Sequence, residues 1–138
     1  MNRPARLLAL CVLAGLLPAG AFAADNARVY IISPVDGATV FRPFTVQFGL
    51  SGMGVAPAGV ARENTGHHHL LIDLDELPPQ DQPLPANEHV IHFGGGQTEV
   101  TLDLLPGKHT LQLILGDHAH VPHDPPVISE RITIHVSE

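Results

Sequence analysis

Alternation of apolar and polar residues with a period of two is the feature of this chain that most restricts its fold. The clearest case is the stretch 44–50, in which every second residue is large and apolar. A strand with one buried face has this pattern, whereas an amphipathic helix needs an apolar period near 3.6. We find no such helical period over two turns, so the sequence predicts an all-β fold. Seven strands are expected, at residues 28–33, 44–50, 67–73, 89–93, 98–104, 108–117 and 128–136.

Seven short strands separated by turn signals are typical of an immunoglobulin-like β-sandwich, with a small barrel as the alternative. In that sandwich the third, sixth and seventh strands share a sheet, and the third and sixth are antiparallel neighbours. The start of the strand expected at 67–73 would then lie beside the end of the one expected at 108–117. This pairing is the expectation on which the functional interpretation depends.

The first 23 residues have the pattern of a secretory signal peptide. Two arginines precede an apolar run over residues 7–17, and a small-x-small cleavage sequence follows at 21–23. The run is too short to anchor a protein across a bilayer. We therefore expect a signal peptide at 1–23, a single β-sandwich domain at 24–138, and a periplasmic or secreted protein without a membrane anchor. Cys11 is the only cysteine and would leave with the signal peptide, so the mature protein has no disulfide and no thiolate ligand.

The charge of the chain excludes one class of partner. Fourteen acidic residues outweigh seven basic ones, which gives a formal net charge of −7 at pH 7. Such a surface repels nucleic acid and anionic lipid but tolerates cations. The chain also carries ten histidines, all of them after the expected cleavage site.

Three consecutive histidines open the strand expected at residues 67–73. Side chains alternate between the two faces of a strand, and Leu70 is expected to face the core. His68 then shares the core side as a structural brace, whereas His67 and His69 face outward. These last two are the first candidate metal ligands.

A second histidine-rich string occupies residues 117–124, at the end of the strand expected at 108–117. The same alternation turns His118 and His120 outward toward the first pair, and His123 would reach the same end from the following loop. Residues two apart on a strand lie about 6.6–6.8 Å apart and paired strands about 4.8 Å, so four imidazoles could converge on one ion at about 2.0–2.1 Å. The predicted metal ligands are His67, His69, His118, His120 and His123, with His68, His92, Asp117, Asp124 and Met53 as further candidates and Asp73 as a ligand or an acceptor that orients a ring.

Imidazole and carboxylate ligands without thiolate favour Cu(II) or Zn(II), with copper first because it binds such ligands most strongly among divalent ions. The first hypothesis is therefore a metal-binding protein for carriage, buffering or sensing. The second is a metal-free module whose histidines form a hydrogen-bonded brace or contact an envelope protein, glycan or wall component. The few serines lie outside any nucleophile elbow, so no catalytic residue is predicted; a copper redox enzyme is the third hypothesis.

Three strings of the chain resemble one family. They are the GHHHLLID of residues 66–73, the HFGGGQTE of residues 92–99, and the histidine-rich residues 116–126. Together they are similar to the secreted bacterial domain-of-unknown-function family forty-three ninety-nine, over nearly all of the mature chain. The resemblance implies a β fold and no established activity. The opening residues 33–40 also resemble the first turn of bacterial immunoglobulin-like domains.

Overall fold

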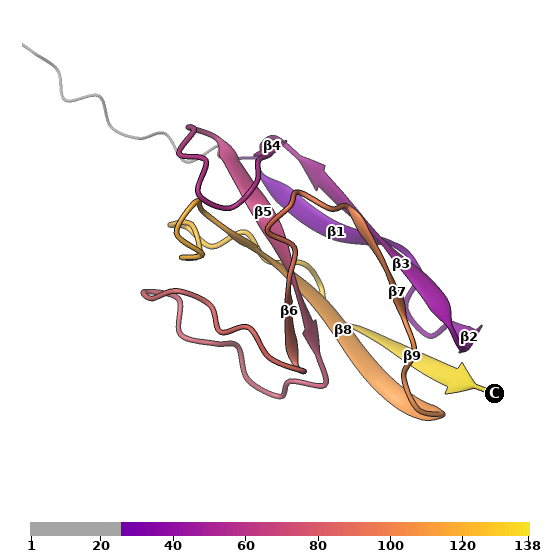
Figure 1. Ribbon diagram of the computed structural model, residues 1–138. Helices are drawn as coiled ribbons and strands as arrows, with labels where there is room; N and C mark the ends of the chain where they lie inside the picture. Colours follow the sequence, from indigo (N-terminus) through magenta and orange to yellow (C-terminus); the bar gives the residue numbers. More distant parts are fainter. Residues whose placement is uncertain (1–25) are drawn as a thin grey trace, which may run out of the picture.

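The computed structural model describes residues 26–138, which form nine strands in two sheets (Figure 1). A three-stranded sheet has the order β1-β3-β7, made of β1 (Arg28–Ser33), β3 (Phe44–Ser51) and β7 (Glu99–Leu102). A six-stranded sheet has the order β2-β9-β8-β5-β4, with β6 also paired to β5. Its strands are β2 (Thr39–Phe41), β4 (Gly54–Val55), β5 (Thr65–Ile72), β6 (Val90–His92), β8 (Gly107–Gly116) and β9 (Ile132–Ser137). The expected signal peptide at 1–23 lies outside the described residues.

The all-β prediction is confirmed, and each of the seven expected strands overlaps an observed strand. The last observed strand begins later than expected. The expected strand 128–136 begins only at Ile132, although Ile128 forms an isolated bridge with Ile114. Two strands were not expected, β2 and β4, because three and two residues are too few to show alternation. An immunoglobulin-like topology stays a prediction, since β6 pairs with β5 instead of joining the sheet of β7.

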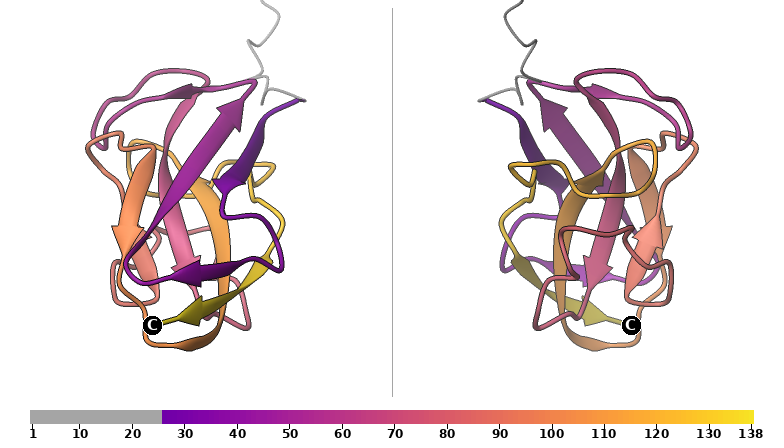
Figure 2. Two further views of the ribbon diagram at one scale, coloured as in Figure 1. Left: turned by 90° about the vertical axis from the view of Figure 1, so that its right-hand side faces the viewer. Right: turned by 90° about the vertical axis from the view of Figure 1, so that its left-hand side faces the viewer.

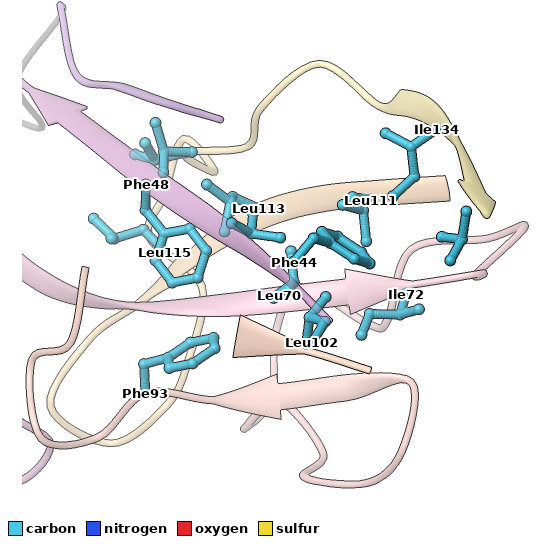
Figure 3. Packing of buried hydrophobic residues seen from close by; sticks show 14 residues of the cluster. Phe44, Phe48, Leu70, Ile72, Phe93, Leu102, Leu111, Leu113, Leu115 and Ile134 are labelled. Carbon is cyan, nitrogen blue, oxygen red and sulfur yellow. The ribbon is translucent and has the colours of Figure 1, made fainter. Parts of the chain in front are cut away.

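The two sheets pack face to face through one apolar cluster (Figures 2 and 3). Alternation along β3 places Phe44, Val46 and Phe48 in this cluster, and alternation along β8 supplies residues 111, 113 and 115 from the opposite sheet. Phe48 also packs edge-on against Phe93, with ring centroids 4.9 Å apart. Burial of this apolar area supplies the main driving force for folding.

The strand β5 is buried on both of its faces, which the sequence does not predict. Leu70 and Ile72 face the main cluster. Leu71 faces the other way, into a smaller cluster with Val90 and Ile114. Leu84, from the long connection between β5 and β6, closes this second cluster. The face that the alternation turns outward is therefore covered by loops instead of by solvent.

The antiparallel pairing of β5 with β8 is confirmed. Their register places His67 opposite Gly116 and His69 opposite Ile114. The start of the histidine string on β5 thus lies beside the end of β8, where the second histidine-rich string begins. This register fixes the position of the candidate site.

At the other end of β5, Asp73 and His109 form a polar brace. Nδ1 of His109 lies 2.7 Å from Oδ2 of Asp73, and its Nε2 lies 2.8 Å from the carbonyl oxygen of Leu105. The second carboxylate oxygen of Asp73 accepts a hydrogen bond from the backbone N–H of Thr110. Asp73, predicted as a ligand or ring-orienting acceptor for the metal, instead lies far along the strand from His67. Partial burial acts to lower the pKa of His109, but the bond to Asp73, the Leu105 carbonyl and the Asp73 charge together raise it.

We expect the contribution of His109 to stability to be largest in mild acid. Both acceptors are satisfied when both ring nitrogens carry protons, which is the charged form. Because folding raises the pKa of His109, this contribution is complete below the unfolded value of about 6.5 and is lost as pH rises through the folded value. The free energy of unfolding of wild type minus that of His109→Gln, measured in urea from pH 5 to 9, should therefore fall with pH. A difference independent of pH, or the same trend in the exposed control His135→Gln, would contradict this expectation.

Candidate metal centre

Three separate segments bring four imidazoles together on the covered face of the six-stranded sheet. His67 and His69 lie on the same face of β5, His92 ends β6 directly opposite His69, and His120 comes from the loop after β8. Figure 1 shows β6 beside β5. We call these four residues the histidine cluster.

The rings of the histidine cluster are in mutual contact. The ring centroid of His67 lies between 4.8 and 5.1 Å from those of the other three, and the His92 and His120 centroids are 4.5 Å apart. Nε2 of His67 and Nε2 of His92 are 3.1 Å apart. One nitrogen from each of His67, His92 and His120 lies within 4.8 Å of the other two. Two nitrogens that share a metal ion at about 2.0–2.1 Å are at most about 4.2 Å apart, so modest side-chain rotations would let these three bind one ion.

His69 is the fourth ring and packs on the remaining side. Its centroid is 5.1 Å from that of His92 and 6.1 Å from that of His120. It is 1% exposed, and His67 is 0% exposed. His92 and His120 are half-buried. The cluster therefore consists of two fully buried rings and two rings that reach solvent in part.

Two glycines make room for these rings. A Cβ added to Gly116 would lie 2.7 Å from Cε1 of His69, and one added to Gly94 would collide with the imidazole of His92. At both positions the added carbon would come closer to the ring than real carbon–carbon contacts allow. The GGG string of residues 94–96, whose sequence does not fit a phosphate-binding loop, thus has a spatial reason for at least its first glycine.

The inner rings lack hydrogen-bond partners that buried imidazoles ordinarily have. Among residues 26–138, no partner is found for Nδ1 of His67 or for either ring nitrogen of His69. A neutral imidazole carries one N–H donor and one lone pair, and leaving such a buried group unpaired costs about 1–3 kcal/mol. Most buried polar groups in folded proteins are paired for this reason. A structural hydrogen-bond network would satisfy these atoms; here the cluster contains one internal contact, between His67 and His92.

Burial keeps the inner imidazoles neutral at physiological pH. Burial first, and then the neighbouring His92 and His120, lower the pKa of His67 to about 4. Burial, followed by the surrounding His67, His92 and His120, lowers the pKa of His69 to about 3. The pKa of His92 is lowered in the same way, by burial and then by His120. Neutral imidazole is the form that binds a metal ion.

We expect the metal-free protein to lose stability in mild acid. Folding lowers the pKa of His67 and His69, so their contribution is present above the unfolded value of about 6.5 and is lost as pH falls toward the folded values. Unfolding of chelator-treated protein in urea should therefore become easier from about pH 6.5 down to pH 4. A variant with both residues replaced by glutamine should show a flatter profile over the same range. An equally steep profile in that variant would assign the acid sensitivity to other groups.

The other predicted ligands are not brought into the cluster. His118 is exposed, and its carbonyl oxygen accepts a hydrogen bond from the N–H of Gly59. His123 turns toward β5, where its Nε2 donates to the carbonyl oxygen of Thr65 at 3.1 Å. The expectation that His118 and His123 would face the first pair is thus not met in the geometry, and a ligand role for either stays an untested prediction.

The further candidates are also placed by the structure. His68 faces the core as expected and packs against Phe48, with centroids 5.2 Å apart. Neither of its ring nitrogens makes a hydrogen bond of ordinary geometry, so it does not brace the fold through such bonds. Burial lowers its pKa, and the backbone of Gln97 offsets this in part. Met53 packs against the main apolar cluster, and Asp124 is exposed.

The misplacement of His118 has a specific physical cause. Alternation extrapolated along β8 holds only as far as Gly116, where the strand ends. Asp117 then starts a tight turn, in which the N–H of His120 donates to the Asp117 carbonyl oxygen. His92 was among the less favoured candidates because its neighbour in the ladder, His69, could not be deduced from the expected topology.

The fold and the site together define a class of protein. It is an all-β domain with a buried histidine cluster between one sheet face and two covering loops. A family model matches residues 46–137, more than half of the chain. The chain therefore belongs to the family described as Domain of unknown function (DUF4399). No curated protein and no solved structure matches the chain. Residues 26–138 contain no helix of the length and apolarity needed to cross a membrane.

Proposed function

We propose that this protein binds one copper or zinc ion through His67, His92 and His120, with His69 as the fourth ligand, and that it carries, buffers or senses that metal outside the cytoplasm. The observation that supports this most directly is the convergence of three ring nitrogens within 4.8 Å of one another. Surface histidines scattered by chance do not meet from three separate segments of the chain.

The chemistry of the donor set narrows the choice of metal. The cluster consists of imidazoles alone, and the one cysteine of the chain, Cys11, lies in the stretch that we expect to be a signal peptide. Imidazole donors suit copper and zinc, whereas Mg²⁺ and Ca²⁺ require oxygen ligands. Four histidines around one ion correspond to the closed, four-coordinate type of site that holds a metal, in contrast to a three-ligand site that leaves a position for substrate.

Burial weighs against the metal-free alternative, in which the histidines contact a partner. His67 and His69 are 0% and 1% exposed, so these two rings offer no surface to a protein or a glycan. The unpartnered ring nitrogens likewise weigh against a purely hydrogen-bonded brace. Coordination of an ion by one nitrogen of each ring accounts for the convergence, for the neutral state and for part of the unmet hydrogen bonding.

The first experiment is a calorimetric titration of chelator-treated protein, with Cu(II) and Zn(II) added in separate runs. We expect one ion per chain with micromolar or tighter affinity, and a higher melting temperature at saturating metal, because a ligand that binds only the folded state stabilises it. Elemental analysis of protein purified from its native envelope would then identify the physiological ion. Binding no tighter than about millimolar for both ions would reject the proposal.

A further inference from the structure

The loop after β8 holds His120 in an unusual backbone conformation. Its φ angle is +69°, in the left-handed region that few non-glycine residues adopt. Such a conformation persists only where the surrounding structure fixes it. A residue that contributes a ring to the histidine cluster from a loop therefore needs a local restraint.

Asp117 supplies that restraint. Its Oδ1 accepts hydrogen bonds from the backbone N–H groups of Ala119 at 2.8 Å and Val121 at 2.9 Å, on either side of His120. Its backbone N–H donates to the carbonyl oxygen of Val121, and its carbonyl oxygen accepts from the N–H of His120. Four hydrogen bonds of one residue thus close the turn around His120.

The second covering loop meets the turn at the same residue. The backbone N–H of Leu84 donates to the carbonyl oxygen of His120 at 2.9 Å. Leu84 itself is buried in the smaller apolar cluster, against Leu71 and Ile114. The backbone of His120 is therefore fixed from its own loop by Asp117 and from the neighbouring loop by Leu84, which leaves its ring directed at His67 and His92.

We propose that Asp117 is a positioning residue for the metal centre, acting through the turn that its carboxylate closes and not as a ligand. The inference rests on the function proposed above. Asp117 was a candidate ligand because of its carboxylate, and here that carboxylate instead holds the backbone that presents His120. Holding a ligand in its bound conformation before the ion arrives removes part of the ordering cost of binding. The carboxylate also lies near enough to His67 for its charge to be felt there, so geometry and charge must be separated by experiment.

Two substitutions separate them. Asp117→Asn keeps an Oδ1 acceptor of the same reach and is well tolerated in such turns, but it removes the charge. Asp117→Ala removes both. We expect Asn to retain zinc or copper affinity within about threefold, and Ala to weaken it by about tenfold or more, as preorganisation predicts.

A readout without metal keeps the inference independent of the proposed function. In chelator-treated protein, the NMR signals of the His120 backbone and ring should shift in Asp117→Ala and stay close to wild type in Asp117→Asn. Equal loss of affinity in both variants would assign the effect to charge and overturn the proposal. Wild-type affinity in Asp117→Ala would also overturn it. Wild-type protein that binds no metal, with the NMR difference intact, would instead reject the proposed function alone. Should Asp117→Ala not fold, a loss of affinity in folded Asp117→Asn suffices to overturn the positioning role.

Discussion

Replacing His67 with alanine should weaken copper or zinc binding by more than about 100-fold. His67 is the central ring of the histidine cluster, within 5.1 Å of each of the other three by ring centroid. Loss of an outer residue that merely orients a ligand already costs about 10–100-fold in affinity, so loss of a central ligand should exceed that range. Competition against a chromophoric chelator at pH 7.5 measures the change.

The matched control is His118→Ala. His118 belongs to the same histidine-rich string as His120, but it is exposed, and among the described residues it is not one of the histidines whose ring nitrogens converge. This variant should bind as wild type does. Because alanine at position 67 leaves a cavity, the apo melting temperature of each variant and the near-isosteric His67→Gln should be measured alongside. Equal affinities for the position 67 and position 118 variants would reject His67 as a ligand.

The sequence predicts the frame of the site because alternation is a property of single strands. The apolar sets on the two central strands fix which residues face the main core, and Leu70 and Leu113 lie there as expected. The same alternation puts His67 and His69 on one face and His68 on the other. Combined with the expected pairing of the two strands, it brings the two histidine strings to one end of one sheet, which the register of β5 and β8 confirms.

The rest depends on chain outside the strands, where alternation carries no information. In the turn that begins at Asp117, the backbone conformation decides that His120 faces the cluster and His118 does not. Alternation along a strand would have turned both residues to the same side. Residues 73–89 have no apolar period, yet they contribute Leu84, which covers the face that was expected to meet solvent. The position of β6 beside β5 is a tertiary choice as well, and it makes His92 a neighbour of His69. One sequence signal could have pointed to His92. Gly94, two residues later, leaves room for the His92 imidazole, and a side chain there would collide with it.

Replacing Gly94 with alanine should weaken metal binding while leaving the fold intact. The added methyl group would collide with the imidazole of His92, which lies at the end of a rotatable side chain and can move aside. It would also lie 3.3 Å from Cβ of Ala58, a contact that a shift of a few tenths of an ångström relieves. The φ angle of Gly94 is outside the left-handed region, so alanine fits its backbone. Such a replacement commonly stabilises a protein by about 0.4–1 kcal/mol through the unfolded state. We therefore expect an apo melting temperature close to that of wild type, together with metal affinity lowered by about tenfold or more.

Gly54→Ala is the control for this substitution. A Cβ at that position meets its nearest neighbour, Cγ2 of Thr65, at 3.4 Å, which is ordinary van der Waals contact, and the site lies on β4 away from His92. Both variants change one glycine to alanine with permitted backbone angles, and they differ in what the methyl group meets. Metal affinity should fall in the Gly94 variant alone, as measured by the same chelator competition. Retained affinity at Gly94→Ala would mean that the bound state does not require the observed position of the His92 ring, and that His67, His69 and His120 suffice to hold the ion.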